Sequence, residues 1–254
     1  MKLAIPLTAL VAISQALTID EQKPLHSSPD LISELIKAEI IPTVLDTFHP
    51  LLTVTLTWPP KHYRKDEPND KHRTQLGNTL KPKHVQRRPR IELLSDLPDV
   101  FNSISAIAGG DHERDHPQLT LILTDPDARS RDDPDWSEMC HWIVTDVPLI
   151  PSNTPKTPQL SSSVSSNQDV EIEMQEIMPY KPPGPPPKTG LHRYVAVALA
   201  PINGTMEQLH LSRPADRKHW GYGGGERLGV RQWAEENGLG VVGANFIYAQ
   251  DKKQ

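Results

Sequence analysis

Proline places the strongest limit on what this chain can fold into. The sequence contains 26 prolines in 254 residues, and they fall between the apolar runs rather than inside them. Proline has no backbone N–H and fixes its own φ, so helix interiors and central strands exclude it. Many short strands joined by stiff loops accommodate such an arrangement, whereas a helical bundle does not. The sequence therefore predicts a mostly β fold.

Apolar runs of strand length recur along the chain. In 170–175, apolar residues alternate with glutamate and glutamine, which is the period of a strand with one face in water. In 195–199, the residues between the large apolar ones are alanines, which indicates a strand that is covered on both faces. Strands are expected at 51–57, 90–94, 119–123, 142–144, 170–175, 195–199 and 241–249.

Two helices are expected outside these strands. The first follows Asp30, whose carboxylate suits an N-cap, and keeps apolar residues at helical spacing until Pro42 interrupts it. The second covers 226–237 and ends before Gly238, the residue type that commonly follows a helix. We predict an antiparallel Greek-key β-sandwich with peripheral helices.

The first residues have the pattern of a short signal peptide. Lys2 precedes an apolar stretch, and small residues stand where a cleavage site requires them. We predict a leader over 1–16 and a single domain over 17–254. The expected location is secreted, or vacuolar through the secretory pathway, with the cytoplasm as the alternative. In the secretory pathway, the sequon Asn203–Gly204–Thr205 would be a glycan acceptor.

The charge and the polar segments exclude some partners. A formal charge of −5 argues against a nucleic-acid binder, which usually carries a basic excess. Surface loops are expected near 59–90 and 151–169. The first is basic but contains a single aromatic residue, Tyr63, where a single-strand-binding surface would interleave several. The leader is too short and too interrupted by Pro6 for a membrane span, and no other stretch could cross a bilayer, so membrane contact is peripheral at most.

The sequence contains one zinc-protease pattern, and its context argues against a metal. His112, Glu113 and His116 satisfy H-E-x-x-H, which binds zinc when a helix places both imidazoles on one face. Here two glycines precede the pattern, Pro117 follows it, and no apolar periodicity flanks it. We interpret it as an exposed loop and predict no metal and no cofactor. A zinc hydrolase is kept as a remote alternative. The lone Cys140, interpreted as a small buried side chain, excludes a multi-cysteine zinc site and an internal disulfide.

Three separate blocks carry polar residues at the ends of expected strands. They are Asp125–Pro126–Asp127–Ala128, Cys140–His141–Trp142 and the proline-rich stretch from Gly184 to Tyr194. Proline holds the residue before it extended, so Asp125 is expected at a strand end. Taken singly, the first block is an ordinary Asp-Pro turn, and the histidines are more often core residues with satisfied hydrogen bonds.

Together, in this order and spacing, the blocks resemble the signatures of the phosphatidylethanolamine-binding protein family, also called Raf-kinase-inhibitor-like proteins. That family shows D-P-D-A, a histidine that starts the following strand, and G-x-P-P-x-G-x-H-R-Y. The stretches 220–223, 229–237 and 77–80 are similar to its fungal carboxypeptidase Y inhibitor branch. The resemblance covers about residues 30 to 250 and implies a β-sandwich with a cavity for a small anion.

The resemblance assigns a ligand-binding set to this chain. A carboxylate near two imidazoles would favour their charged form, and a phenol would add a further donor to a phosphate. Arg129 stands where the family usually has proline, which would leave the rim more open or more basic. The pocket positions are Asp125, His141, His192 and Tyr194, with Gly184 and Pro186 on the rim and Trp136 at the mouth.

Other residues near these blocks are interpreted as structural. Arg193 is expected to form a salt bridge with Asp127, and Trp220 and Trp233 are better explained by packing than by recognition.

The resemblance implies a monomeric binding protein without catalytic residues. It would hold a phosphate-type anion or phospholipid head group and, through a separate surface, inhibit a serine carboxypeptidase of the carboxypeptidase Y kind. One alternative is a signalling adaptor that binds a kinase or a small-GTPase regulator. An enzyme is disfavoured because the sequence has no G-x-S-x-G nucleophile elbow.

Overall fold

A computed structural model describes residues 30–60, 71–95, 118–151, 174–205, 208–220 and 228–253. The expected leader, the H-E-x-x-H pattern and the loop near 151–169, apart from Pro151, lie outside the described residues. The part of the chain that the structure describes contains no helix long and apolar enough to span a membrane.

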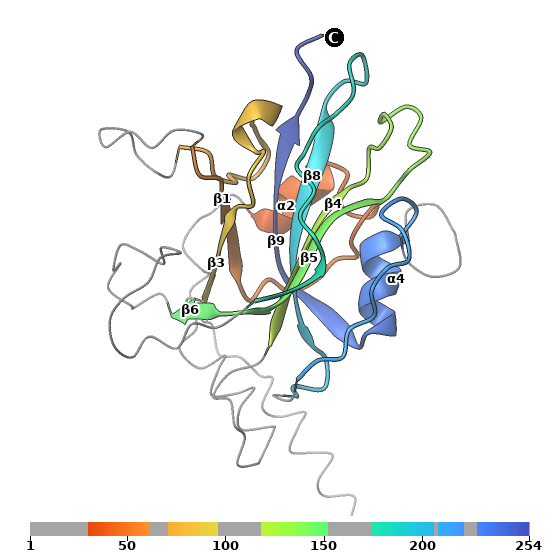
Figure 1. The fold of residues 1–254 in the computed structure, drawn as a ribbon. Helices are drawn as coiled ribbons and strands as arrows, with labels where there is room; N and C mark the ends of the chain where they lie inside the picture. The colour runs from red at the N-terminus through yellow and green to blue at the C-terminus, as the bar shows by residue number, and fades with distance from the viewer. Residues whose placement is uncertain are drawn as a thin grey trace, which may run out of the picture.

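The strands form two sheets, which confirms the mostly β fold (Figure 1). Neighbours in the large sheet pair antiparallel, except that β2 and β9 are parallel. In the small sheet β1 and β3 are antiparallel, and β3 and β6 are parallel. The order in the large sheet is β2 (Asn78–Thr79), β9 (Leu239–Ala249), β8 (His192–Pro201), β4 (Leu119–Asp125), β5 (Met139–Val147) and β7 (Gln175–Met178). The order in the small sheet is β1 (Thr53–Thr57), β3 (Arg90–Ser95) and β6 (Leu149–Pro151).

The large sheet is covered on both faces. One apolar cluster fills the space between the two sheets, and a second packs the other face of the large sheet against α2 (Leu31–Lys37) and α4 (Gly229–Glu236). Every residue of β4 and β8 is therefore buried. This confirms the expectation that the strand at 195–199 has no wet face. Figure 1 shows the small sheet and α4 on opposite sides of the large one.

Both helices are shorter than their apolar patterns. In α2 the regular turn ends at Ala38, and the apolar residues after it reach the same core from turns instead. Asp30 precedes α2 as predicted, but its carboxylate accepts the Ser33 hydroxyl at 2.6 Å rather than capping a backbone N–H. The predicted stop after α4 is confirmed, because Gly238 adopts a left-handed φ of 65°.

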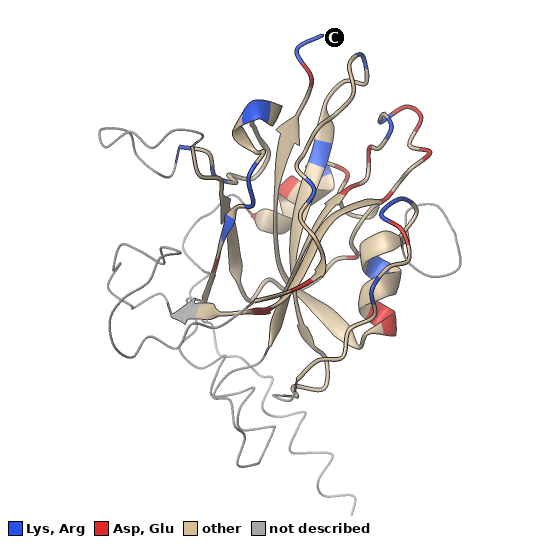
Figure 2. Ribbon diagram, in the orientation of Figure 1, with Lys and Arg blue, Asp and Glu red and all other residues tan. Residues whose placement is uncertain are grey.

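The second half of the predicted surface loop near 59–90 is mostly exposed or half-buried, but it is anchored to the core. This part contains β2 and the short helix η1 (Pro82–His84), and it buries Leu80 and Val85. The Thr74 hydroxyl also accepts the backbone N–H of Leu56 in β1 at 3.0 Å. Isolated apolar residues in a polar segment have no periodicity, so no sequence pattern indicated this packing. The lysines and arginines of this segment are exposed. Figure 2 shows their positions along the ribbon on and near η1.

Candidate functional site

Sheet topology brings the three sequence blocks to one place. Strand β4 lies between β5 and β8 and runs antiparallel to both. The end of β4, at Asp125, is therefore adjacent to the beginning of β5 and of β8, where His141 and His192 lie. Tyr194 follows His192 by two residues and faces the same side of the sheet. All four side chains are buried, with exposed fractions of 1–2%.

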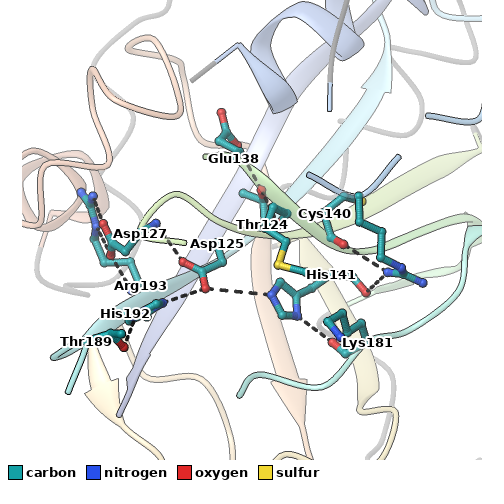
Figure 3. A network of polar contacts seen from close by, with 12 residues as sticks. Thr124, Asp125, Asp127, Glu138, Cys140, His141, Lys181, Thr189, His192 and Arg193 are labelled. Carbon is teal, nitrogen blue, oxygen red and sulfur yellow. Dashed lines mark hydrogen bonds and ion pairs between the residues drawn. The ribbon is translucent and has the colours of Figure 1, made fainter. Parts of the chain in front are cut away.

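A bulge in β5 gives His141 its position. Leu123 pairs with Trp142, and the next residue of β4, Thr124, pairs with Cys140, so His141 is the extra residue opposite β4. Bulges of this kind redirect a side chain and are common beside functional sites. Here the extra residue places the imidazole Nε2 of His141 4.0 Å from Oδ2 of Asp125 (Figure 3).

Hydrogen bonds define the protonation of His192. Its Nδ1 lies 3.0 Å from Oδ2 of Asp125, and its Nε2 lies 2.9 Å from Oγ1 of Thr189. The Thr189 hydroxyl in turn donates to the carbonyl of Pro186 at 2.8 Å. A carboxylate and a carbonyl can only accept, so all three bonds form together only when both ring nitrogens of His192 donate. The geometry therefore fits an imidazolium paired with the Asp125 carboxylate.

His141 has a different environment. Its Nδ1 lies 2.8 Å from the carbonyl of Lys181, which makes Nδ1 the protonated nitrogen. Its Nε2 has no hydrogen-bond partner among the described residues. Burial lowers the pKa of His141, although the Asp125 charge acts in the opposite direction. The expectation that Asp125 keeps both imidazoles charged is thus not met at His141, because desolvation of this ring outweighs the attraction of the carboxylate.

Tyr194 completes the cluster. Its ring packs edge-on against His141, with 5.1 Å between centroids, and stacks near His192 at 6.4 Å. Burial raises the pKa of Tyr194 well above its usual value, and the charge of Asp125, to which the hydroxyl is hydrogen-bonded, raises it further. The backbone N–H of Gly184 also bonds the phenol oxygen. The phenol therefore stays neutral.

The residues predicted for the rim and mouth of the pocket differ in where they lie relative to the cluster. Gly184 touches Tyr194, and Pro186 binds Thr189, so both join the cluster through backbone atoms. Trp136 lies under the ammonium of Lys218, whose Nζ is 3.7 Å from the ring centroid. Arg129 contacts two carboxylates, at 2.8 Å from Asp133 and 2.6 Å from Asp135. Its positive charge is thus locally compensated, which counters the expectation of a more basic rim.

Sequence reasoning missed three residues that hold the cluster in place. Thr189 fixes His192, and Lys181 supplies the carbonyl that fixes His141. The guanidinium of Arg217 donates to the carbonyls of Cys140 and His141, at 3.1 and 3.3 Å, and so holds the bulge. Of these three residues, only Thr189 could have been found from the sequence, because a hydroxyl three residues before a histidine can reach the histidine ring in a turn.

The structural interpretations of the remaining residues are confirmed. Arg193 pairs with Asp127, with Nε 2.9 Å from Oδ2, and Trp220 and Trp233 belong to the core beneath α4. Burial raises the pKa of the Cys140 thiol to about 12, which excludes it as a nucleophile at neutral pH. Within the described ranges, no group of three or more histidine, cysteine or acidic side chains could hold a metal ion.

Comparison with known sequences extends these observations. The sequence model of the family described as "Phosphatidylethanolamine-binding protein" matches residues 73–247 of this chain. The carboxypeptidase Y inhibitor of Saccharomyces cerevisiae is 32% identical over 177 residues, which are 70% of this chain and 78% of the inhibitor. CEN-like protein 1 of Nicotiana tabacum is 28% identical over 221 residues, 87% of this chain and 93% of that protein.

Solved structures of proteins of this kind resemble this chain in fold. A crystal structure of carboxypeptidase Y inhibitor complexed with its cognate proteinase superimposes with a TM-score of 0.66 and 26% identity, covering 90% of this chain and 98% of the inhibitor. The phosphatidylethanolamine-binding protein of Plasmodium vivax shares the fold, with a TM-score of 0.56 and 20% identity over 89% of this chain and all of that one. With the fold, the signature blocks and the extent of the sequence match in agreement, this chain belongs to the phosphatidylethanolamine-binding protein family.

Proposed function

We propose that this protein inhibits a serine carboxypeptidase of the carboxypeptidase Y kind and does not turn over a substrate. One observation carries the proposal: the inhibitor of Saccharomyces cerevisiae is similar to this chain in sequence, and a carboxypeptidase Y inhibitor in complex with its proteinase is similar over 98% of its length in structure. Shared fold alone would not support an activity, but sequence identity across most of both chains adds weight.

The proposal includes a second, separate role for the Asp125 cluster as a site for a phosphate-type anion or phospholipid head group. The polar hydrogens of His192 and Tyr194 already bond Asp125 and Thr189, whereas His141 offers a ring nitrogen without a partner among the described residues. Buried polar groups normally have partners, so an unpartnered nitrogen beside a carboxylate and a phenol supports a site that a ligand completes. Because the cluster is buried, we place the protease contact on a different, exposed surface.

The inhibitory role predicts a simple titration. The purified full chain, added in molar excess to carboxypeptidase Y, is expected to abolish hydrolysis of a peptide substrate, with an endpoint near one inhibitor per enzyme. A zinc-dependent carboxypeptidase serves as the control and is expected to keep its activity, since the proposed target is the serine class. Full carboxypeptidase Y activity at excess inhibitor would refute this half of the proposal and leave the anion site untouched.

We further propose entry into the secretory pathway, supported by the leader pattern over 1–16 and by the position of the sequon. Asn203 is exposed in the turn after β8, and its side-chain oxygen accepts the Thr205 N–H at 3.1 Å. Endoglycosidase treatment of the natively produced protein is expected to lower its mass. The Asn203→Gln variant should lack that shift, and Thr205→Ser should retain it. An unmodified chain that still begins at Met1 would favour the cytoplasmic alternative.

A further inference from the structure

The Asp125 cluster is buried and carries no net charge in the hydrogen-bonding state described above. The carboxylate of Asp125 is balanced by the imidazolium of His192, while His141 and Tyr194 are neutral. An anion that entered would bring a charge with no counter-charge inside the cluster. Buried charges are costly unless they are paired, so binding requires a positive charge from elsewhere.

Cations around the cluster are poorly placed to supply that charge. The side chain of Lys181 is exposed, and only its carbonyl contacts the cluster. The guanidinium of Arg217 is committed to the carbonyls of Cys140 and His141. Arg193 lies on the opposite face of β8, where Asp127 pairs with it. Each of these cations already has another partner or faces water.

His141 is the member of the cluster that can acquire a positive charge. Its Nδ1 already carries a proton for the Lys181 carbonyl, so a second proton must enter at Nε2, the atom without a partner. The groups that face this ring oppose one another. Asp125 favours a charged ring, and the positive charges of Lys181 and Arg217 disfavour it. A bound anion would add to the effect of Asp125 and satisfy the new N–H.

We propose that an anion enters this site together with one proton, which Nε2 of His141 takes up and shares with the anion in a hydrogen bond. This inference rests on the proposed anion-binding role of the same cluster. The ligand class is a tetrahedral oxyanion that presents an acceptor oxygen to Nε2–H. A phosphate monoester can supply the proton itself, since its second pKa is near 6, whereas a phosphodiester or a sulfonate requires one from solvent.

The proposal fixes the direction of the pH dependence. In the free protein the pKa of His141 lies below its ordinary value, and a bound anion raises it. Between these two pKa values, affinity for a sulfonate or phosphodiester should fall about tenfold for each unit of rising pH. Below the lower value the ring is already charged, and above the higher value it is neutral even with anion present, so affinity levels off on both sides.

Calorimetric titration with methanesulfonate tests the proposal, because this monoanion cannot itself take up a proton near neutral pH. Near pH 7, in buffers of different ionisation enthalpy, we expect uptake of up to about one proton per anion bound. Inorganic phosphate and a water-soluble short-chain phospholipid, titrated in parallel, distinguish a free phosphate from a lipid head group as the tighter ligand.

Two variants locate the proton. The His141→Gln variant places an amide near the position of Nε2 that cannot titrate, so it should bind the anion more weakly than the natural chain, and its residual binding should occur without proton uptake and without the pH slope. His84→Gln is the matched control, since His84 on η1 is another histidine whose pKa burial lowers and it lies outside the cluster. Its proton uptake should equal that of the natural chain. Nitrogen-15 spectra of the natural chain should show Nε2 of His141 unprotonated when free and protonated when saturated with methanesulfonate.

Each outcome has one meaning. Anion binding without proton uptake, or uptake that persists in His141→Gln, overturns the inference and leaves the anion-binding role intact. Absence of binding by every anion between pH 5 and 8 overturns that role and the inference with it. If His141→Gln fails to fold, the nitrogen-15 spectra of the natural chain decide the question alone.

Discussion

Arg193→Met is expected to destabilise the folded protein by about 3–5 kcal/mol. The guanidinium of Arg193 is 4% exposed and binds the carboxylate of Asp127, which is 1% exposed. It also donates to the carbonyls of Ala38 and Glu39, at 2.9 and 2.8 Å, and so attaches the end of α2 to β8. Removal of the guanidinium leaves a buried carboxylate and two carbonyls without their main donor. The free-energy cost of these unpaired groups is much larger than the net stabilisation that the intact ion pair contributes.

Urea-induced unfolding of the two chains measures this effect as a shift of the midpoint. Arg131→Met is the matched control, because Arg131 makes an exposed ion pair with Glu39, at 2.7 Å between Nη2 and Oε2. Exposed pairs contribute at most about 1 kcal/mol, so the control should remain close to the natural chain. The double variant Arg193→Met with Asp127→Leu should recover part of the loss, since no buried charge remains. A loss below about 1 kcal/mol in the single variant would contradict the argument.

The sequence was a good guide where a strand has a regular environment along its length. Strands β4 and β8 are mostly apolar because both of their faces are covered; β4 ends at a polar block, and β8 begins at one. The position of Asp125 followed from Pro126, and its proximity to His192 requires only that β4 and β8 are antiparallel neighbours. The first fact is local, whereas the pairing of β4 with β8 belongs to the fold that the family shares, so the family blocks predicted the composition of the cluster.

The sequence was a poor guide where tertiary contacts decide. The packing of 71–90 depends on a few apolar residues and on backbone bonds to distant strands, such as Leu80 N–H to the Tyr248 carbonyl at 2.8 Å. The protonation of His141 depends on the carbonyl of Lys181 and on burial, and neither has a sequence pattern. The contact of Trp136 with Lys218 depends on where the loop after β4 folds. These properties appear only in the assembled structure.

Glu138 is buried, as Asp125 and Asp127 are, and it lies on the other side of β4 from Asp125 (Figure 3). Its Oε2 accepts the Thr124 hydroxyl at 3.1 Å, its carboxyl also accepts a backbone bond from Val230 in α4, and its Oε1 has no partner among the described residues. The side chain is fully buried, and burial raises its pKa to about 8. The folded protein therefore retains a proton on Glu138 at neutral pH that the unfolded chain releases.

Glu138→Gln is accordingly expected to stabilise the protein in a pH-dependent way. Below pH 4.5, the ordinary pKa of this carboxyl, both states hold the proton and the variant should match the natural chain. Between pH 4.5 and about 8 the natural chain loses about 1.4 kcal/mol for each pH unit, because only its unfolded state ionises. The uncharged amide avoids this loss, so the variant should be more stable by about 3 kcal/mol at pH 7.

Thermal unfolding of both chains at pH 4 and pH 7 measures the difference, and Glu236→Gln at an exposed position of α4 is the control that should show little pH dependence. The expected gain is an upper value, because a glutamine amide has two N–H donors that need acceptors, whereas a protonated carboxyl has one O–H donor. The decisive quantity is therefore the change in the gain between the two pH values rather than its size at either. An equal effect at pH 4 and pH 7 would mean that Glu138 is ionised in the folded protein, held by Thr124 and the beginning of α4 despite its burial.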